Sequence, residues 1–178
     1  CPGAGACGGQ YTANTMSTVL EFLGIAPGGL NAIPALDPDK DAAAEQAGRI
    51  VMDLVRKDIR PSQILTRHAI ENAIASVAAT GGSTNGVLHL LAIARELGIP
   101  LSIDDFDVIL ERTPVIADMK PWGRYVATDL YAAGGLGLVA RELARRDLIH
   151  VDALTVDGRS IGEVAEATEE RPGQQVVV

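Results

Sequence analysis

The residues best suited to chemistry lie at the start of the chain, in Cys1-Pro-Gly-Ala-Gly-Ala-Cys-Gly-Gly-Gln-Tyr-Thr-Ala-Asn-Thr-Met16. This stretch holds both cysteines of the chain, and its glycines at positions 3, 5, 8 and 9 allow the backbone to approach a bound group closely. It runs directly into a predicted helix, whose free N–H groups and dipole favour a thiolate or another anion at that end. The pattern indicates a thiol placed for chemistry.

The residues alone leave several roles open for the two cysteines. Cys1 and Cys7 could form a disulfide, remain idle thiols or ligate a metal, and spacing alone favours an inert loop cysteine. Two thiolates cannot complete a tetrahedral zinc site or a four-cysteine cluster site. His68, His89 and His150 are scattered along the chain and fit no ligand spacing.

The same glycines also match a dinucleotide-binding pattern, because Gly3 to Gly8 has the form G-x-G-x-x-G. That function requires a strand before the loop and an acidic residue about 20 residues on, at the end of a second strand. No strand is predicted before Gly3, and Glu21, the nearest acid at that distance, lies inside a predicted helix. The nucleotide interpretation is therefore the weaker one.

A second glycine-rich segment, Gly81-Gly-Ser-Thr-Asn85, has two interpretations. Composition favours a boundary between two helices, because Gly commonly ends helices and Ser or Thr begins them. The alternative is an anion or carboxylate site at the N-terminus of a buried helix. Nearby, His89 is predicted to be a core histidine, and the acidic run at Asp104, Asp105 and Asp107 is predicted to begin a helix rather than bind a metal.

Apolar periodicity predicts the elements that position these segments. We expect helices over residues 12–23, about 40–57, a short one from 61, one after the cap Thr66, then about 85–97, 104–113, a short one before 134, and about 136–146. Short strands are expected over 100–103 and 115–117, and a hairpin over 153–161 with its turn at Asp157-Gly158. The fold class is thus α/β and helix-dominated.

Two of these helices carry specific predictions about how their apolar residues are arranged. The helix over 40–57 has one apolar face, and charged residues lie opposite it. The helix to residue 97 is apolar nearly all round and should be buried. The members of the first apolar face are Ala47, Ile50, Val51, Leu54 and Val55.

The bulk properties exclude several classes of protein. The 178 residues can form one domain with a sizeable core, and the net charge of −8 without a Lys/Arg cluster argues against nucleic acid. No apolar run is long enough to span a membrane. Two cysteines do not make a disulfide framework, so a reducing, cytoplasmic setting is expected.

The chain also has the features of a piece of a longer protein. It begins at Cys1, inside a motif, and ends on the apolar run Gln174-Gln-Val-Val-Val178, which is typical of the start of a strand. A shift in composition near residue 150 predicts a boundary between residues 1–150 and residues 151–178.

The opening stretch closely resembles a signature of the dihydroxy-acid dehydratases, within a larger group that includes phosphogluconate and sugar-acid dehydratases. Gln10 stands where many members have Met, and Trp122 where a small residue is usual. The resemblance covers nearly the whole chain in order. It continues through Thr66-Arg-His-Ala-Ile-Glu-Asn-Ala-Ile74, Gly81-Gly-Ser-Thr-Asn85, Val87-Leu-His-Leu90, Asp104-Asp-Phe106, Ala117-Asp-Met-Lys-Pro121 and Leu154-Thr-Val156.

The resemblance implies a hydro-lyase that converts 2,3-dihydroxy acids to 2-oxo acids in branched-chain amino-acid and pantothenate biosynthesis. Such enzymes hold a [2Fe-2S] or [4Fe-4S] cluster by three cysteines, and an open iron site acts as a Lewis acid on the departing 3-hydroxyl. A magnesium ion positions the carboxylate, and a serine alkoxide in the C-terminal domain removes the C2 proton. The resemblance also implies a cytoplasmic homodimer.

By the resemblance, one cluster ligand carries over to this chain. Cys7 matches the third cluster cysteine, whereas Cys1 matches a position that is often cysteine but is not a ligand. Gly82, Ser83, Thr84 and Asn85 are predicted to border the substrate pocket. The other cysteines, the magnesium ligands and the serine base have no counterpart here, so the chain alone is expected to be inactive.

The resemblance also predicts an architecture. Residues 1–150 would be the later part of an N-terminal three-layer α/β/α domain, and residues 151–178 would begin a C-terminal β-rich domain with its first β-hairpin. Two alternatives remain open at this point. One is a sugar-acid dehydratase of the same family, and the other is a free-standing α/β module that binds a nucleotide or a protein through the glycine-rich loop.

Overall fold

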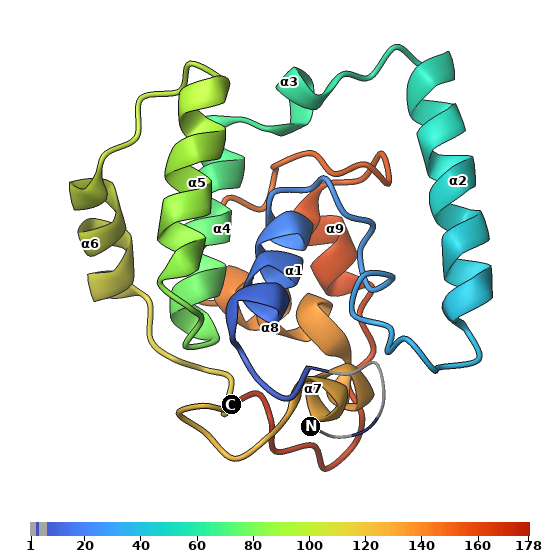
Figure 1. Ribbon diagram of the computed structural model, residues 1–178, viewed down its shortest axis with the longest axis vertical. Coiled ribbons are helices and arrows are strands. Elements are labelled where there is room, and N and C mark those ends of the chain that lie inside the picture. The colour runs from blue at the N-terminus through green and yellow to red at the C-terminus, as the bar shows by residue number, and fades with distance from the viewer. Residues whose placement is uncertain (1–2, 4–6) are drawn as a thin grey trace.

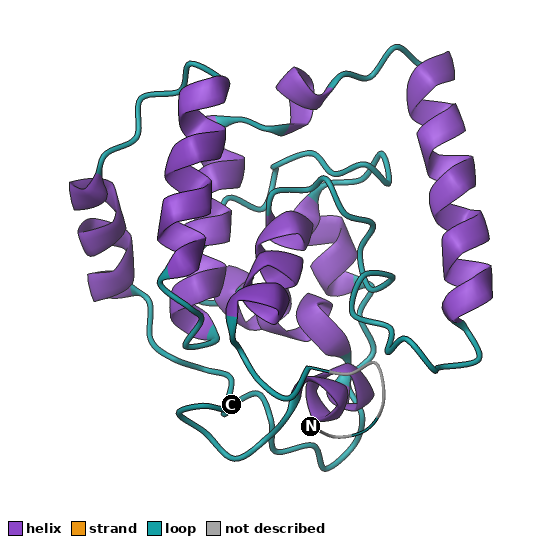
Figure 2. Ribbon diagram, in the orientation of Figure 1, coloured by secondary structure: helices purple, strands orange, loops and turns teal. Residues whose placement is uncertain are grey.

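The computed structural model describes Gly3 and residues 7–178, and helices dominate it (Figures 1 and 2). Within these residues β structure is limited to isolated bridges. The helices are α1 (Thr12–Phe22), α2 (Lys40–Arg56), α3 (Pro61–Ile64), α4 (Arg67–Ala79), α5 (Asn85–Glu96), α6 (Ile103–Arg112), α7 (Ala127–Ala133), α8 (Gly135–Ala144) and α9 (Ile161–Glu166).

The core is built around α4, which packs against α1, α5, α6 and α8. Its side chains Ile70 and Ile74 are completely buried, and the predicted cap Thr66 accepts a hydrogen bond from the Ala69 N–H. Because most of α4 is apolar or small, neighbouring helices can approach it from several sides. The helix therefore supports α1 and, through it, the cysteine loop.

The helix boundaries agree closely with the periodicity of the sequence. The helix predicted over residues 12–23 is α1, and Gly24 follows it with φ of +78°, a conformation that Gly adopts without strain. The helices predicted about 40–57 and 136–146 are α2 and α8. The local spacing of apolar residues is sufficient to locate these elements, because it depends only on neighbours within a few residues.

The prediction that α5 is buried was wrong, and the apolar face predicted for α2 is largely exposed. In α2 only Ala43 is buried, whereas Val51 and Val55 are 56% and 68% exposed, and Figure 1 shows this helix apart from the others. In α5 Leu88 is 65% exposed and His89 is also exposed, so His89 is not a core histidine. An apolar face indicates that a helix can pack against something, but it does not show that these 178 residues contain the element against which it packs.

The predicted strands are also largely wrong. Residues 100–103 form no strand, and Ile103 is the first residue of α6. From the stretch 115–117, Ala117 alone forms a bridge, antiparallel to Val177. Each stretch is too short for its own sequence to decide the outcome, and neither finds a neighbouring strand with which to form a ladder.

The predicted hairpin over residues 153–161 is reduced to one antiparallel bridge between Leu154 and Ser160. Its second arm becomes α9 at Ile161. The Ser160 hydroxyl accepts from the Glu163 N–H at 3.2 Å, and the Glu163 carboxylate accepts from the Ser160 N–H at 2.8 Å. This reciprocal capping box starts a helix where the alternation of residues suggested a strand.

The helix-dominated character of the fold is confirmed. A layered α/β/α sheet is not found in the described part of the chain, where strands pair only as single bridges. Ala153, Ile161 and Val177 belong to the same hydrophobic core as α1 and α4. The division of the chain near residue 150 stays a prediction.

Candidate cysteine site

Cys7 lies on a loop that the first helix holds in place. The Asn14 side chain, one turn into α1, donates hydrogen bonds from Nδ2 to the Gly9 carbonyl at 2.7 Å and to the Cys7 carbonyl at 3.3 Å. The Cys7 thiol itself is half-buried and free. The predicted arrangement, a thiol on a glycine-rich loop before a helix N-terminus, is therefore present for Cys7.

A distant segment holds the other side of this loop. The Gln10 N–H donates to the Lys120 carbonyl at 2.7 Å, and a Cβ on Gly9 would lie only 2.5 Å from that same carbonyl oxygen. Gly9 is thus required for the close approach of two backbones, as expected for glycine in such a loop. The resemblance covered both segments, but sequence spacing gave no sign that they meet.

A cavity of about 240 Å³ lies beside Cys7. Its wall combines α1, the loop over residues 31–35, α7 and the buried Met119. The size suits a small polar molecule rather than a drug-sized ligand. Chemically important lining groups are Cys7, Asn14, Ser17, Thr18, Lys40 and Tyr131.

Lys40 and Tyr131 give one side of this cavity its electrostatic character. The Lys40 ammonium donates to the Ile33 carbonyl at 2.7 Å, which leaves two of its three donors for other groups. Burial raises the pKa of the Tyr131 phenol, and the carboxylates of Asp37 and Asp39 raise it further. The cavity therefore presents the Lys40 side chain beside a Tyr131 phenol whose raised pKa favours the neutral form, and the two groups can together hold a carboxylate or hydroxyl group.

Gln10 is a cavity-lining residue that sequence reasoning did not select. It is 3% exposed, and its Nε2 donates to the Thr18 hydroxyl at 3.3 Å, while that hydroxyl donates to the Asn14 carbonyl. Its Oε1 has no hydrogen-bond partner among the described residues. The only available signal was the resemblance, by which Met is expected where Gln10 stands; Gln10 places a buried acceptor at this position.

The predicted substrate-pocket residues lie on another side of α1. The Ser83 N–H donates to the Thr15 hydroxyl at 2.9 Å, and Asn85 Nδ2 donates to the Thr12 hydroxyl at 2.7 Å. Gly82 packs against Thr15 as well. These contacts bring residues 82–85, including Thr84, beside the helix that carries the cysteine loop, but not into the lining of the cavity beside Cys7. Their role at a substrate stays a prediction.

The acidic residues near position 105 act as predicted, at the start of a helix. Asp105 accepts from the Ser102 N–H in a capping box, and Asp104 lies in the same turn. The hydrogen bond from Arg67, together with that from Ser102, lowers the pKa of Asp105 to about 2. Arg67 also binds Glu71, whose other carboxylate oxygen lies 2.6 Å from His150 Nε2. This network ties α4 to α6 and is separate from the cysteine loop.

The chain as described cannot complete a metal centre. Across Gly3 and residues 7–178, no group of three or more His, Cys, Asp or Glu side chains could hold a metal ion. Cys7 supplies one sulfur, which fits one corner of an iron–sulfur cluster and not a whole site. Cys1 and residues 4–6 of the G-x-G-x-x-G pattern lie outside the described residues.

Comparison with known proteins places the chain in a family. A family model described as dihydroxy-acid/6-phosphogluconate dehydratase N-terminal matches residues 1–164. The chain therefore belongs to the dihydroxy-acid and 6-phosphogluconate dehydratase family.

Individual relatives agree with this assignment. The chain is 62% identical to a dihydroxy-acid dehydratase of Koribacter versatilis over 99% of its own length and 31% of the relative. It is 56% identical to a dihydroxy-acid dehydratase of Roseiflexus sp. and 54% identical to one of Thermus thermophilus, with 99% of this chain and 32% of each relative covered. The chain thus spans about a third of the length of these curated relatives.

One further finding concerns membranes. In the described part of the chain, no helix combines the length and the apolar character that a membrane crossing requires.

Proposed function

We propose that this chain is the part of a dihydroxy-acid dehydratase that supplies Cys7 to an iron–sulfur cluster and forms one wall of the substrate site. The complete enzyme would remove water from a 2,3-dihydroxy-3-methyl carboxylic acid to give a 2-oxo acid in branched-chain amino-acid biosynthesis. One observation carries the proposal. In a member of this family, the free thiol of Cys7 lies at the wall of a cavity, on a loop whose backbone is held by Asn14 and Lys120.

The Cys7 loop has the properties expected of a cluster ligand. A sulfur that binds iron must be deprotonated, reachable and held in place, and the Cys7 sulfur is accessible while its backbone is fixed on both sides. When bound, the cluster would supply Lewis-acid chemistry at the departing hydroxyl. One thiol leaves the remaining ligands to other parts of the complete protein.

The groups around the cavity define what this chain contributes to the substrate. The Lys40 ammonium can attract the carboxylate of the acid, and the Tyr131 phenol and the Ser17 hydroxyl can donate hydrogen bonds to its oxygens. The apolar Met119 lies on the same wall and suits an alkyl substituent. Magnesium and the base that removes the C2 proton are proposed to act through residues outside this chain.

A sugar-acid substrate is the alternative with an observation in its favour. The matching family model covers phosphogluconate dehydratases as well, and Gln10 adds a buried acceptor to the cavity lining. In an assay of the complete protein with both acids in competition, we expect the branched-chain acid to be consumed preferentially. Preferential consumption of the sugar acid would reverse the substrate assignment within the family.

We further propose a cytoplasmic homodimer as the working form of the complete enzyme. The support is the resemblance of the motifs to the family, together with a cysteine content that does not suit an oxidising compartment. The free-standing binding module is not favoured, because the three relatives described above share 99% of this chain and are dihydroxy-acid dehydratases.

The proposal is tested by exchanging the two cysteines separately in the complete protein. Cys7→Ala should abolish the visible absorption and the electron paramagnetic resonance signal of the cluster, because the variant removes the one cluster ligand that this chain is proposed to supply. Cys1→Ala should retain both signals. An intact cluster in Cys7→Ala would overturn the proposal, and loss in both variants would show that Cys1 is a ligand too.

A further inference from the structure

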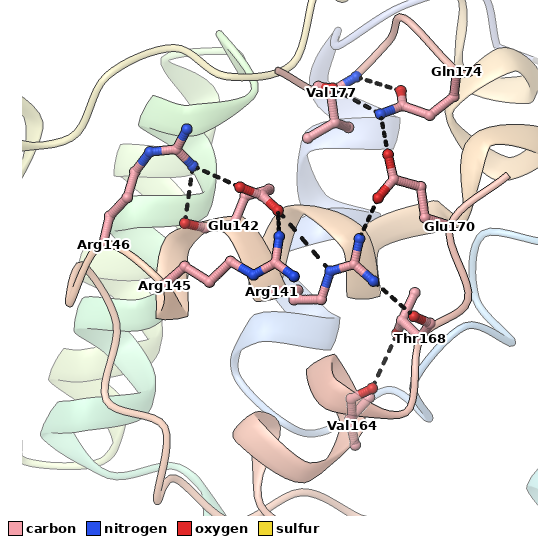
Figure 3. A network of polar contacts seen from close by, with 9 residues as sticks. All are labelled: Arg141, Glu142, Arg145, Arg146, Val164, Thr168, Glu170, Gln174 and Val177. Carbon is pink, nitrogen blue, oxygen red and sulfur yellow. Dashed lines mark hydrogen bonds and ion pairs between the residues drawn. The ribbon is translucent and has the colours of Figure 1, made fainter. Parts of the chain in front are cut away.

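Gln174 forms a clamp near the C-terminal end of the described chain (Figure 3). Its Oε1 accepts hydrogen bonds from the Val176 and Val177 N–H groups at 2.8 and 2.9 Å. Its Nε2 donates to the Val177 carbonyl at 2.8 Å and to Glu170 Oε1 at 2.9 Å. Because one side chain satisfies three backbone groups, it fixes the conformation of this short segment.

The clamp is anchored to a core helix through Glu170. Arg141 on α8 donates from Nη2 to the other Glu170 carboxylate oxygen at 2.5 Å and from Nη1 to the Thr168 carbonyl at 3.0 Å (Figure 3). The Arg141 side chain is only 16% exposed, so this ion pair is partly shielded from water. The neighbouring residues Leu138 and Val139 belong to the hydrophobic core.

The clamped segment in turn holds the stretch that contacts the cysteine loop. The Asp118 N–H donates to the Val176 carbonyl at 2.8 Å, and the Val178 N–H donates to the Ile116 carbonyl at 2.9 Å. Val176 and Val177 are both buried, and Ala117 pairs with Val177 as an antiparallel bridge. Residues 116–118 are thus held from two sides, by the clamped segment and by the Ala79 carbonyl of α4, which accepts from the Ile116 and Ala117 N–H groups at 2.9 and 3.0 Å.

Residues 116–120 complete the connection to Cys7. The Lys120 carbonyl accepts from the Gln10 N–H, at the point where Gly9 approaches too closely to tolerate a side chain. Met119, between the clamped stretch and Lys120, lines the cavity together with Cys7. A continuous set of contacts thus runs from Arg141 and Gln174 to the cysteine loop.

We propose that Gln174 is a positioning residue for Cys7, acting through residues 116–120 on the loop that carries the thiol. The effect on a bound cluster rests on the function proposed above, whereas the effect on the loop rests on geometry alone. Gln174 is not among the residues that line the cavity, and its hydrogen bonds go to Glu170, Val176 and Val177, so its contribution is to hold the Lys120 carbonyl where Gln10 and Gly9 meet it.

The test uses the complete protein with Gln174→Ala and follows the loop by amide hydrogen exchange. Exchange in the peptide that contains residues 7–11 should speed up by about fivefold or more, because the Gln10 N–H loses a fixed acceptor. The cluster should also be lost in air several times faster than in the unaltered protein. If Gln174→Ala fails to fold, Glu170→Ala removes the hydrogen bonds that Glu170 accepts from Gln174 and Arg141 but keeps those from Gln174 to the backbone, and it should produce a smaller change in the same direction.

Asn72→Ala is the matched control, because Asn72 makes a comparable amide clamp elsewhere. Its side chain donates to the His150 carbonyl at 2.9 Å and accepts from the His150 N–H at 2.7 Å. We expect faster exchange around residue 150 and unchanged exchange at residues 7–11. The proposal is overturned if Gln174→Ala leaves residues 7–11 unchanged, or if Asn72→Ala accelerates them equally. Retention of the cluster in Cys7→Ala would refute only the proposed function, because the exchange measurement needs no cluster.

Discussion

Gly9 and Asn14 show how single residues set the geometry around Cys7. Asn14 holds two carbonyl groups of the loop from one side, and the absence of a side chain at Gly9 allows the Lys120 carbonyl to approach from the other. The loop is therefore fixed by its own helix and by a segment more than a hundred residues away. Neither contact requires the thiol, which stays available for a ligand.

Glu21 is a single residue whose charge state couples folding to pH. It lies on α1 with 7% exposure, its Oε2 accepts from the Gly29 N–H at 3.2 Å, and its Oε1 has no partner among the described residues. Burial raises the pKa of Glu21 to about 7, and the negative charge of Asp157 raises it as well. The folded state therefore binds this proton more tightly than the unfolded state does.

The direction of the pH effect follows from this raised pKa. Between the ordinary pKa of 4.5 and about 7 the folded state holds more protons, so stability falls as the pH rises through this window. We expect Glu21→Gln to have a higher free energy of unfolding than the unaltered chain at pH 8. This advantage of the variant should be smaller at pH 5 than at pH 8, by about 2 kcal/mol. Urea unfolding of the 178-residue chain at both pH values measures this. Glu166→Gln on the exposed face of α9 is the control, and an equal response of both variants would contradict the prediction.

At the scale of elements, α4 and α2 have similar apolar patterns, but the apolar side chains of α4 are buried and those of α2 are largely exposed. Ile74 of α4 is completely buried, whereas Val55 of α2 is 68% exposed. The free energy of unfolding should thus depend strongly on α4 and weakly on the apolar face of α2. The difference arises because α4 has packed neighbours on several sides within this chain and α2 does not.

Two truncations quantify this difference. Ile74→Ala should lower the unfolding free energy of the chain by about 3 kcal/mol, since it leaves a cavity in the core. Val55→Ala should change it by less than about 0.5 kcal/mol, as is usual for exposed side chains. Chemical denaturation of both variants checks the prediction. A comparable loss in Val55→Ala would mean that α2 packs against the rest of the chain.

At the scale of the whole molecule, the described residues do not supply a complete metal site. The described residues contain no group of three metal-ligating side chains, and the chain spans 31% of its Koribacter relative. The helices nevertheless present Cys7 on a fixed loop next to a formed cavity. Under the proposed function, this chain would form one wall of a site whose other groups come from further segments.

This incompleteness predicts the behaviour of the isolated chain. After anaerobic reconstitution with iron and sulfide, the 178-residue chain should show no stable cluster absorption and no dehydration of a 2,3-dihydroxy acid. The physical reason is that one thiolate ligand cannot hold a cluster that requires several. An absorption spectrum and an assay for the 2-oxo acid provide the measurement. A stable cluster with turnover in the isolated chain would contradict the interpretation of Cys7 as one ligand of several.

Sequence patterns were informative wherever the cause is local. The spacing of apolar residues located α1, α2 and α8, and Thr66 was recognised as the cap of α4 because its hydroxyl acts three residues away. The glycine-rich loop before α1 was predicted for the same reason. Motif resemblance added the family, which the comparisons with known proteins confirm.

Contacts between distant residues were decided only by the tertiary structure. The meeting of Gly9 with Lys120, the packing of Ser83 on Thr15 and the clamp of Gln174 leave no periodic signal, because each depends on how separate elements dock. The exposure of α2 has the same origin. Periodicity depends on neighbours within a few positions along one chain, whereas a site requires atoms brought together from segments that are far apart in the sequence.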